Sequence, residues 1–245
     1  MYDHRIRVTG SGPLLVFVPG LDGTGELFYR QEPLLAARHR VITYPLREEA
    51  TDLAVLVDDL ARIIRRAGHG SATVVGESFG GAVALSFALA HPELTAELVI
   101  LNSFARFLPQ ARLRLAILAL AALPFPWQIM TVVRRLTAFL LHSRYTHARE
   151  IRRFLELTAR TTRAAYLRRL RILRRYDVRE RLGEIRAPTL FLASDRDHLV
   201  PAVAQARYMA QRVPGAAVRV LEGHGHICLI APNVDLAAIL EEWRR

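Results

Sequence analysis

The sequence has 245 residues, of which 51% are hydrophobic and 23% are charged. A chain of this length and composition can bury a sizeable core, which excludes an intrinsically disordered protein. Cys228 is the only cysteine, so an intramolecular disulfide is excluded, and residues 1–12 lack the apolar segment of a secretion signal. We therefore expect one globular unit in a reducing, cytoplasmic setting.

The positive charge is concentrated in one part of the chain. The formal net charge at pH 7 is +11, and all 34 basic residues are arginines. Residues 106–186 contain 19 arginines and 5 acidic residues, whereas the rest of the chain contains 15 arginines and 18 acidic residues. This distribution indicates a module whose surface differs from that of the remaining chain.

Residues 1–103 alternate between short apolar runs and helix-length segments. The apolar runs predict strands, and apolar residues at helical spacing predict helices. Gly68 is a suitable stop for the second helix. In chain order we predict strands at 6–8 and 14–18, a helix at 25–38, a strand at 40–44, a helix at 51–67, a strand at 72–75, a helix at 80–90 and a strand at 98–101.

Residues 104–186 interrupt this rhythm with helix-like, arginine-rich sequence that has no strand pattern. The alternation then resumes, with strands predicted at 189–193 and 217–221 and helices at 202–213 and 234–243. Strands that alternate with helices indicate βαβ units and a mostly parallel sheet flanked by helices. We therefore predict an α/β core made of residues 1–103 and 187–245, with an all-helical cap inserted at 104–186.

An apolar stretch lies within the predicted cap. Residues 115–133 comprise 19 residues, of which only Gln128 and Thr131 are polar. This length approaches that of a membrane span, but Pro124 and Pro126 would break a helix in its middle. A single crossing would also put the two core segments on opposite sides of the bilayer. We expect two short apolar helices that form a lid, covering a pocket or dipping into a lipid interface.

Gly76-Glu77-Ser78-Phe79-Gly80 lies between the predicted strand at 72–75 and the following helix. A sharp strand-to-helix turn exposes a serine hydroxyl, and the flanking glycines avoid clashes with the neighbouring strand and helix. The backbone N–H of Phe79 would open the helix, where the helix dipole favours a developing negative charge. This arrangement predicts that Ser78 is a nucleophile.

A serine hydroxyl of ordinary pKa needs a base, and the base needs an acid that orients it. Two loops after later strands carry candidates for these roles. Residues 194–201 contain Asp195 and Asp197, and residues 222–226 contain His224 and His226. The other histidines are scattered without the spacing of metal ligands, so we expect no metal site and no cofactor.

The loop after the strand at 14–18 has the sequence Pro19-Gly20-Leu21-Asp22-Gly23-Thr24-Gly25. It lies between a predicted strand and a predicted helix. We expect the Leu21 backbone N–H, together with that of Phe79, to bind an oxyanion. A glycine-rich turn without a catalytic role is the alternative.

Together these segments resemble the α/β-hydrolase superfamily over almost the whole chain except the insertion. In that fold the order along the chain is serine, acid, histidine. The resemblance implies that Asp197, in a D-x-x-V-P arrangement, is the acid and that His226, in a G-H-x-x-x-x-x-P arrangement, is the base. Asp195 would then be a turn residue, and His224 a loop histidine with local hydrogen bonds.

Two narrower resemblances concern the oxyanion loop and the cap. The run P-G-L-D-G-T-G is similar to a loop of bacterial α/β hydrolases and of the plant phytyl ester synthase group. That group also carries an H-x-x-x-x-D acyltransferase motif, of which this sequence has no convincing copy. The basic cap is similar in composition to that of pimeloyl-carrier-protein methyl ester esterase, whose arginines face an acidic carrier.

The resemblance implies hydrolysis of a carboxylic ester or thioester with an apolar acyl or alcohol part, through an acyl-enzyme. Apolar residues of the lid, among them Leu118, Phe125 and Trp127, are expected to line the substrate pocket. Packing within the cap is the alternative for these side chains. Haloalkane dehalogenases and epoxide hydrolases of this superfamily have an aspartate at the position of the nucleophile. The serine at this position, Ser78, therefore argues against their chemistry.

Partners and rival functions remain open at this level. The basic cap is consistent with an anionic membrane surface, which would make the protein membrane-peripheral, with an acidic carrier protein, or with a solvated helical face. Nucleic acid is not expected, because no recognition motif accompanies the charge. An acyltransferase or lyase that uses the same triad, and a non-catalytic small-molecule receptor, are the alternative functions.

Overall fold

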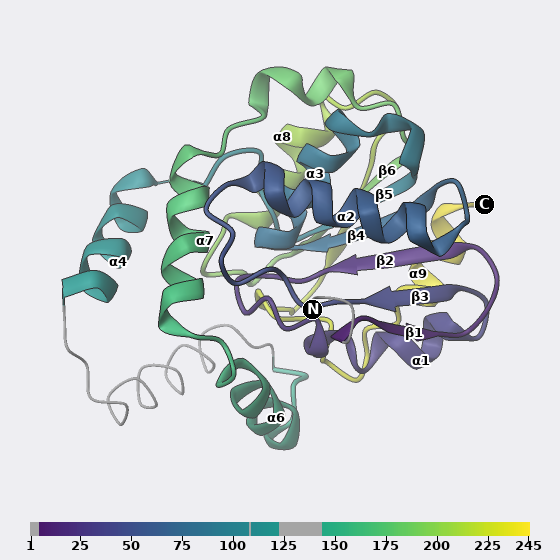
Figure 1. Ribbon diagram of the computed structural model, residues 1–245. Coiled ribbons are helices and arrows are strands. Elements are labelled where there is room, and N and C mark those ends of the chain that lie inside the picture. Colours follow the sequence, from purple (N-terminus) through teal and green to yellow (C-terminus); the bar gives the residue numbers. More distant parts are fainter. Residues whose placement is uncertain (1–4, 108, 123–143) are drawn as a thin grey trace.

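The computed structural model describes residues 5–107, 109–122 and 144–245, which form a central sheet with helices on both faces (Figure 1). The sheet has seven strands in the order β1-β3-β2-β4-β5-β6-β7. β1 pairs antiparallel with β3, and all other neighbouring strands are parallel, so the predicted α/β fold with a mostly parallel sheet is confirmed. The strands are β1 (Arg7–Thr9), β2 (Leu14–Val18), β3 (Arg40–Thr43), β4 (Ala72–Glu77), β5 (Thr95–Leu101), β6 (Thr189–Ser194) and β7 (Ala217–Leu221).

The central strands supply side chains to two separate cores, one on each face of the sheet. Successive residues of a strand point to opposite faces, and both faces are covered here. In β2, Leu14, Val16 and Val18 belong to one core, whereas Leu15 and Phe17 belong to the other. This explains why the strand is a continuous apolar run rather than an alternating one.

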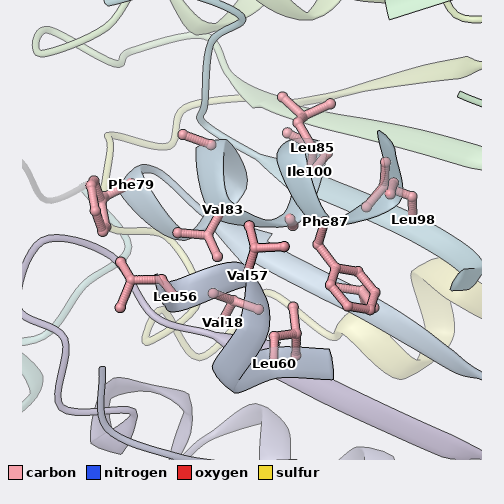
Figure 2. Packing of buried hydrophobic residues seen from close by; sticks show 14 of the residues in the cluster. Val18, Leu56, Val57, Leu60, Phe79, Val83, Leu85, Phe87, Leu98 and Ile100 are labelled. Carbon is pink, nitrogen blue, oxygen red and sulfur yellow. The ribbon is translucent and has the colours of Figure 1, made fainter. Parts of the chain in front are cut away.

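Helices from both halves of the chain cover the two faces. The first core lies under α2 (Leu53–Ala67), α3 (Phe79–Ala90) and α8 (Ala202–Ala210), and the second under α1 (Gln31–Ala36) and α9 (Leu236–Trp243). Figure 2 shows the first core, where Val57 of α2 lies beside Val83 of α3. The short 3-10 helix η3 (Pro92–Leu94) connects α3 to β5.

The ends of α2 follow from its capping residues. The Asp52 side chain accepts a hydrogen bond from the Ala54 N–H at 2.9 Å, which satisfies one of the free donors of the first turn. Gly68 ends the helix with φ 74, a left-handed conformation that glycine adopts without a steric cost. The predicted stop at Gly68 is therefore confirmed.

The helix predicted at 25–38 is divided in the structure. A 3-10 helix, η2 (Glu26–Phe28), comes first, and α1 begins only at Gln31. Pro33 lies in the first turn of α1, where its missing N–H has no cost. A helix continuous through Tyr29 would bring the proline ring against the Tyr29 carbonyl, so the prediction of one helix was wrong.

Between β5 and β6 the described residues contain helices and no strand. They are α4 (Gln110–Ala122), α6 (Ala148–Thr158), α7 (Arg163–Arg175) and the 3-10 helix η4 (Arg179–Glu184). In Figure 1, α7 stands across the end of the sheet toward which β2 and β3 point. Within the described part of the chain, no helix has the length and apolar character needed to span a bilayer. The cap boundaries and the lid at 115–133 stay predictions, because residues 123–143 lie outside the described residues.

Candidate active site

Ser78 lies at the sharp turn between β4 and α3. Its φ of 54° and ψ of −115° are a strained combination for a residue with a side chain. Close packing holds the turn in place. A Cβ atom on Gly80 would lie 2.0 Å from the Val18 carbonyl oxygen, and one on Gly76 would lie 2.5 Å from the Gly80 carbonyl oxygen. The two glycines therefore allow the turn that places Ser78 at the carboxyl end of β4.

A continuous hydrogen-bond chain joins three of the predicted residues. Ser78 Oγ lies 2.9 Å from His226 Nε2, and His226 Nδ1 lies 2.6 Å from Asp197 Oδ2. The side chains of His226 and Asp197 are both buried. The other Asp197 oxygen accepts the backbone N–H groups of Leu199 and Val200, each at 2.9 Å. This carboxylate thus holds the imidazole with one nitrogen directed at the Ser78 hydroxyl.

The two competing candidates lie elsewhere in the same loops. Asp195 Oδ1 accepts the Gly223 N–H at 2.6 Å and so ties the loop after β6 to the loop after β7. The His224 ring packs 5.1 Å from the Tyr145 ring, and its Nε2 lies 3.3 Å from the Asn233 amide nitrogen. Burial lowers the pKa of His224, which favours the neutral imidazole. The structure therefore joins Asp197, rather than Asp195, to a histidine that contacts Ser78.

The Gly20–Gly23 turn lies beside Ser78. A Cβ atom on Gly20 would be 3.7 Å from Ser78 Cβ, and the Gly23 N–H donates to the Gly20 carbonyl at 3.0 Å to close the turn. Among the described residues, no acceptor receives the Leu21 N–H. Phe79 is the first residue of α3, so its N–H has no partner within the helix. Both N–H groups are therefore available to an oxyanion.

Asn102 was not recognised from the sequence, although it directly follows a strand at the same edge of the sheet. Its side-chain nitrogen donates to Ser194 Oγ at 2.9 Å and to the His226 carbonyl at 2.8 Å, and its oxygen accepts the Ser194 N–H at 2.7 Å. Next to it, Ser103 Oγ donates to the Ser78 carbonyl at 2.7 Å. These two residues connect the end of β5 to both the turn that carries Ser78 and the loop that carries His226.

Two buried acidic groups lie close to this site. Burial, with a smaller contribution from the charge of Asp22, raises the pKa of Glu77 to about 8. Its Oε1 has no hydrogen-bond partner among the residues that the structure describes. Burial, and then the nearby Glu77, raise the pKa of the Cys228 thiol to about 12. Cys228 is therefore an unreactive thiol at neutral pH.

Of the three residues predicted to line the substrate pocket, Leu118 is the one that lies within the described residues. Leu118 lies on α4 with 64% of its surface exposed, and Phe125 and Trp127 lie outside the described residues. Their contact with substrate stays a prediction. In residues 5–107, 109–122 and 144–245, no group of three or more His, Cys, Asp or Glu side chains is arranged to hold a metal ion.

Sequence comparison identifies a family and its relatives. Residues 13–231 match the family model described as alpha/beta hydrolase fold. A protein of Azorhizobium caulinodans, provisionally named carbamate hydrolase RutD, is 30% identical over 250 residues, covering 95% of this chain and 91% of that protein. A protein of the same provisional name from Caulobacter sp. strain K31 is 29% identical over 240 residues, covering 92% of this chain and 88% of its own length.

Solved structures with a similar fold include several hydrolases. A hydrolase from Pseudomonas aeruginosa superposes with a TM-score of 0.86 at 22% identity, covering 98% of this chain and 93% of that one. An esterase from Exiguobacterium antarcticum gives 0.86 at 18% identity, with 98% and 95% covered. An enol-lactonase from Burkholderia xenovorans gives 0.85 at 18% identity, with 98% and 95% covered. At these identities the likeness concerns the fold alone.

Proposed function

This chain belongs to the α/β-hydrolase family, and on that premise we propose that it is a serine hydrolase that cleaves a carboxylic ester or thioester with an apolar acyl or alcohol part. The observation that carries the proposal is the hydrogen-bond chain from Ser78 through His226 to Asp197. Hydrolysis is the chemistry named for the relatives and for several proteins of the same fold.

In the acylation step, Ser78 Oγ attacks the carbonyl carbon while His226 Nε2 takes the hydroxyl proton. The Asp197 carboxylate stabilises the imidazolium that forms. The carbonyl oxygen becomes an oxyanion, which accepts hydrogen bonds from the Leu21 and Phe79 N–H groups. The carbon–oxygen or carbon–sulfur bond then breaks, and the His226 proton goes to the departing alcohol or thiol.

In the deacylation step, a water molecule takes the place of the departed alcohol or thiol. His226 removes a proton from the water as its oxygen attacks the acyl carbon. The second tetrahedral intermediate uses the same two N–H donors. Its collapse releases the carboxylic acid and returns the proton to Ser78 Oγ, so the enzyme is unchanged after one turnover.

A carbamate is the second candidate substrate, because the relatives at 29% and 30% identity carry the name carbamate hydrolase. The same attack on a carbamate carbonyl forms a carbamoyl-enzyme on Ser78. A lone-pair-donating nitrogen makes that carbonyl less electrophilic than an ester carbonyl. Activated esters are therefore the better first probe, and a carbamate series with matched leaving groups distinguishes the two classes.

The proposal is tested with p-nitrophenyl esters of increasing acyl length. We expect turnover by the wild type that favours medium or long chains and is lost in Ser78→Ala. Ser86→Ala serves as the matched control, because Ser86 lies on α3 outside the hydrogen-bond chain. A fluorophosphonate probe should label the wild type and Ser86→Ala but not Ser78→Ala.

Three other outcomes would replace the proposal. No turnover and no labelling of Ser78 would indicate a non-catalytic small-molecule receptor. Ester products in the presence of added alcohol, with little free acid, would indicate an acyltransferase. If the substrate is cleaved but its acyl part is recovered neither as a carboxylic acid nor as a new ester, the protein would be a lyase.

A further inference from the structure

One arginine of α7 is buried against the oxyanion loop. Only 2% of the surface of Arg169 is exposed, whereas the neighbouring Arg171 and Arg174 of the same helix are exposed. Arg169 Nη1 donates to the Leu21 carbonyl at 2.8 Å and to the Asp22 carbonyl at 3.0 Å. Its Nη2 lies 3.4 Å from the Leu46 carbonyl in the loop after β3. One guanidinium therefore joins α7 to two loops at the carboxyl edge of the sheet, a use for which its planar set of donors is suited.

The loop is shaped to receive this guanidinium. Gly23 has φ +63°, and a Cβ atom on it would lie 2.3 Å from Arg169 Cζ. Just before α7, Thr161 Oγ1 also donates to the Asp22 carbonyl, at 2.6 Å. The Asp22 carboxylate is directed to its own turn and accepts the Thr24 N–H at 2.9 Å. Backbone carbonyls, rather than the adjacent carboxylate, thus form the hydrogen bonds to Arg169.

Holding these carbonyls also orients the N–H group that matters for catalysis. In a trans peptide the C=O and N–H bonds point in opposite directions. The Gly20 carbonyl is held by the Gly23 N–H, and the Leu21 and Asp22 carbonyls are held by Arg169. The Leu21 N–H shares a peptide with the Gly20 carbonyl, and the Gly23 N–H that holds this carbonyl shares a peptide with the Asp22 carbonyl that Arg169 holds. The Leu21 N–H consequently keeps one direction, in a turn that packs against Ser78.

We propose that Arg169 is a positioning residue that holds the Gly20–Gly23 turn so that the Leu21 N–H stays directed at the oxyanion. This inference rests on the proposed hydrolase function, and it adds a dependence of that site on α7. A donor that is already in place when charge develops is worth far more than one that must reorient. Loss of Arg169 should therefore weaken binding of the transition state more than binding of the substrate.

The test compares Arg169→Gln with Arg171→Gln, an exposed arginine two positions further along the same helix. We expect kcat for the preferred p-nitrophenyl ester to fall by about 10- to 100-fold in Arg169→Gln with KM little changed. Arg171→Gln should retain both values. Affinity for a boronic acid analogue, whose oxygen occupies the oxyanion position, should fall in Arg169→Gln by a factor similar to that in kcat/KM.

A second variant probes the same contact from the loop side. Gly23→Ala leaves Arg169 in the chain but puts a methyl group where its guanidinium lies, so it should lower kcat in the same way.

Arg169 and the loop also line a cavity of about 320 Å³, which gives a small cation access to the contact. Millimolar guanidinium should therefore restore part of the activity of Arg169→Ala, while sodium at equal ionic strength should not.

Hydrogen exchange separates this inference from the proposed function. Faster amide exchange at residues 21–23 in Arg169→Gln, but not in Arg171→Gln, would show that Arg169 orders the turn even if no ester is turned over. If the wild type is active and Arg169→Gln retains its kcat and its exchange pattern, the inference is wrong and the hydrolase proposal stands. A lower unfolding temperature with unchanged kcat would also overturn it, since Arg169 would then serve folding alone.

Discussion

Asn102 holds the histidine loop to the sheet through one side chain. Its three hydrogen bonds to Ser194 and to the His226 carbonyl are buried, and its φ of 46° lies in the left-handed region. Asparagine tolerates that conformation better than most residues with a side chain. The position therefore requires both a backbone preference and a hydrogen-bonding side chain.

Two substitutions of Asn102 separate these requirements. Asn102→Gly keeps the backbone unstrained but removes the hydrogen bonds, and should lower the free energy of unfolding by roughly 2–4 kcal/mol. Asn102→Ala should lose about 1–2 kcal/mol more, because alanine is strained at positive φ. Urea denaturation of the wild type, Asn102→Gly and Asn102→Ala measures the free energy lost with the hydrogen bonds and the free energy lost to backbone strain. Equal stability of Asn102→Gly and wild type would mean that the side-chain bonds contribute nothing.

Glu77 makes stability depend on pH. In the unfolded chain its carboxyl ionises near the ordinary pKa of 4.5, whereas burial raises the pKa in the folded protein to about 8. Between these values the folded state binds one proton more than the unfolded state. Rising pH therefore lowers the free energy of unfolding, by at most about 1.4 kcal/mol per pH unit from this group.

Glu77→Gln should remove that slope, because an amide carries no titrating proton. We expect the variant to lose less stability than the wild type between about pH 5 and about pH 8, as measured by urea denaturation across that range. Glu180→Gln, at an exposed carboxyl, is the control and should follow the wild type. Parallel curves for wild type and Glu77→Gln would show that Glu77 does not titrate in this range.

At the scale of elements, the contact between α3 and the end of β2 places the turn that carries Ser78. A Cβ atom on Gly80 would lie 2.0 Å from the Val18 carbonyl oxygen and 2.6 Å from that of Pro19. Backbone atoms cannot give way as a flexible side chain does. The first turn of α3 can therefore pack against β2 only through glycine.

Gly80→Ala should destabilise the protein by roughly 3 kcal/mol or more, because the helix must move away from β2. Labelling of Ser78 by a fluorophosphonate should slow in parallel. Gly183→Ala is the matched control, since its Cβ would meet its nearest neighbour at 3.7 Å, an ordinary contact, and should change stability by less than about 0.5 kcal/mol. If Gly80→Ala and Gly183→Ala were equally stable, the contact between α3 and the Val18 carbonyl would not restrict position 80 to glycine.

The elements also show where local sequence reasoning succeeds. β2 and β7 have the predicted bounds, because each is a short run between turn signals. β5 begins three residues earlier than predicted, at Thr95, so that the strand includes the charged Glu97. The Glu97 carboxylate pairs with Arg244, 147 positions away, and accepts from Thr73 on the adjacent strand. No local pattern contains that partner.

For the whole molecule, the sequence gives the net charge and its distribution along the chain, but it does not show which charged side chains are buried and which are exposed. Residues 106–186 carry 19 arginines, and they are not equivalent in the fold. Arg171, Arg174 and Arg175 are exposed on α7, whereas Arg169 on the same helix is buried against two loops. The expected partners of the basic region, an anionic membrane surface or an acidic carrier protein, stay proposals, as does a purely solvated face.

The sequence by itself determined the order of strands and helices and the three loops that carry Ser78, Asp197 and His226. Hydrophobic periodicity and glycine spacing act over a few residues, so they can be recognised locally. The family resemblance favoured Asp197 as the acid, and only the tertiary structure shows that Asp197, rather than Asp195, contacts His226, 29 positions away. It alone revealed that Arg169 holds the Leu21 carbonyl across 148 positions. Such contacts depend on strand register and on burial, which arise only when distant segments pack together.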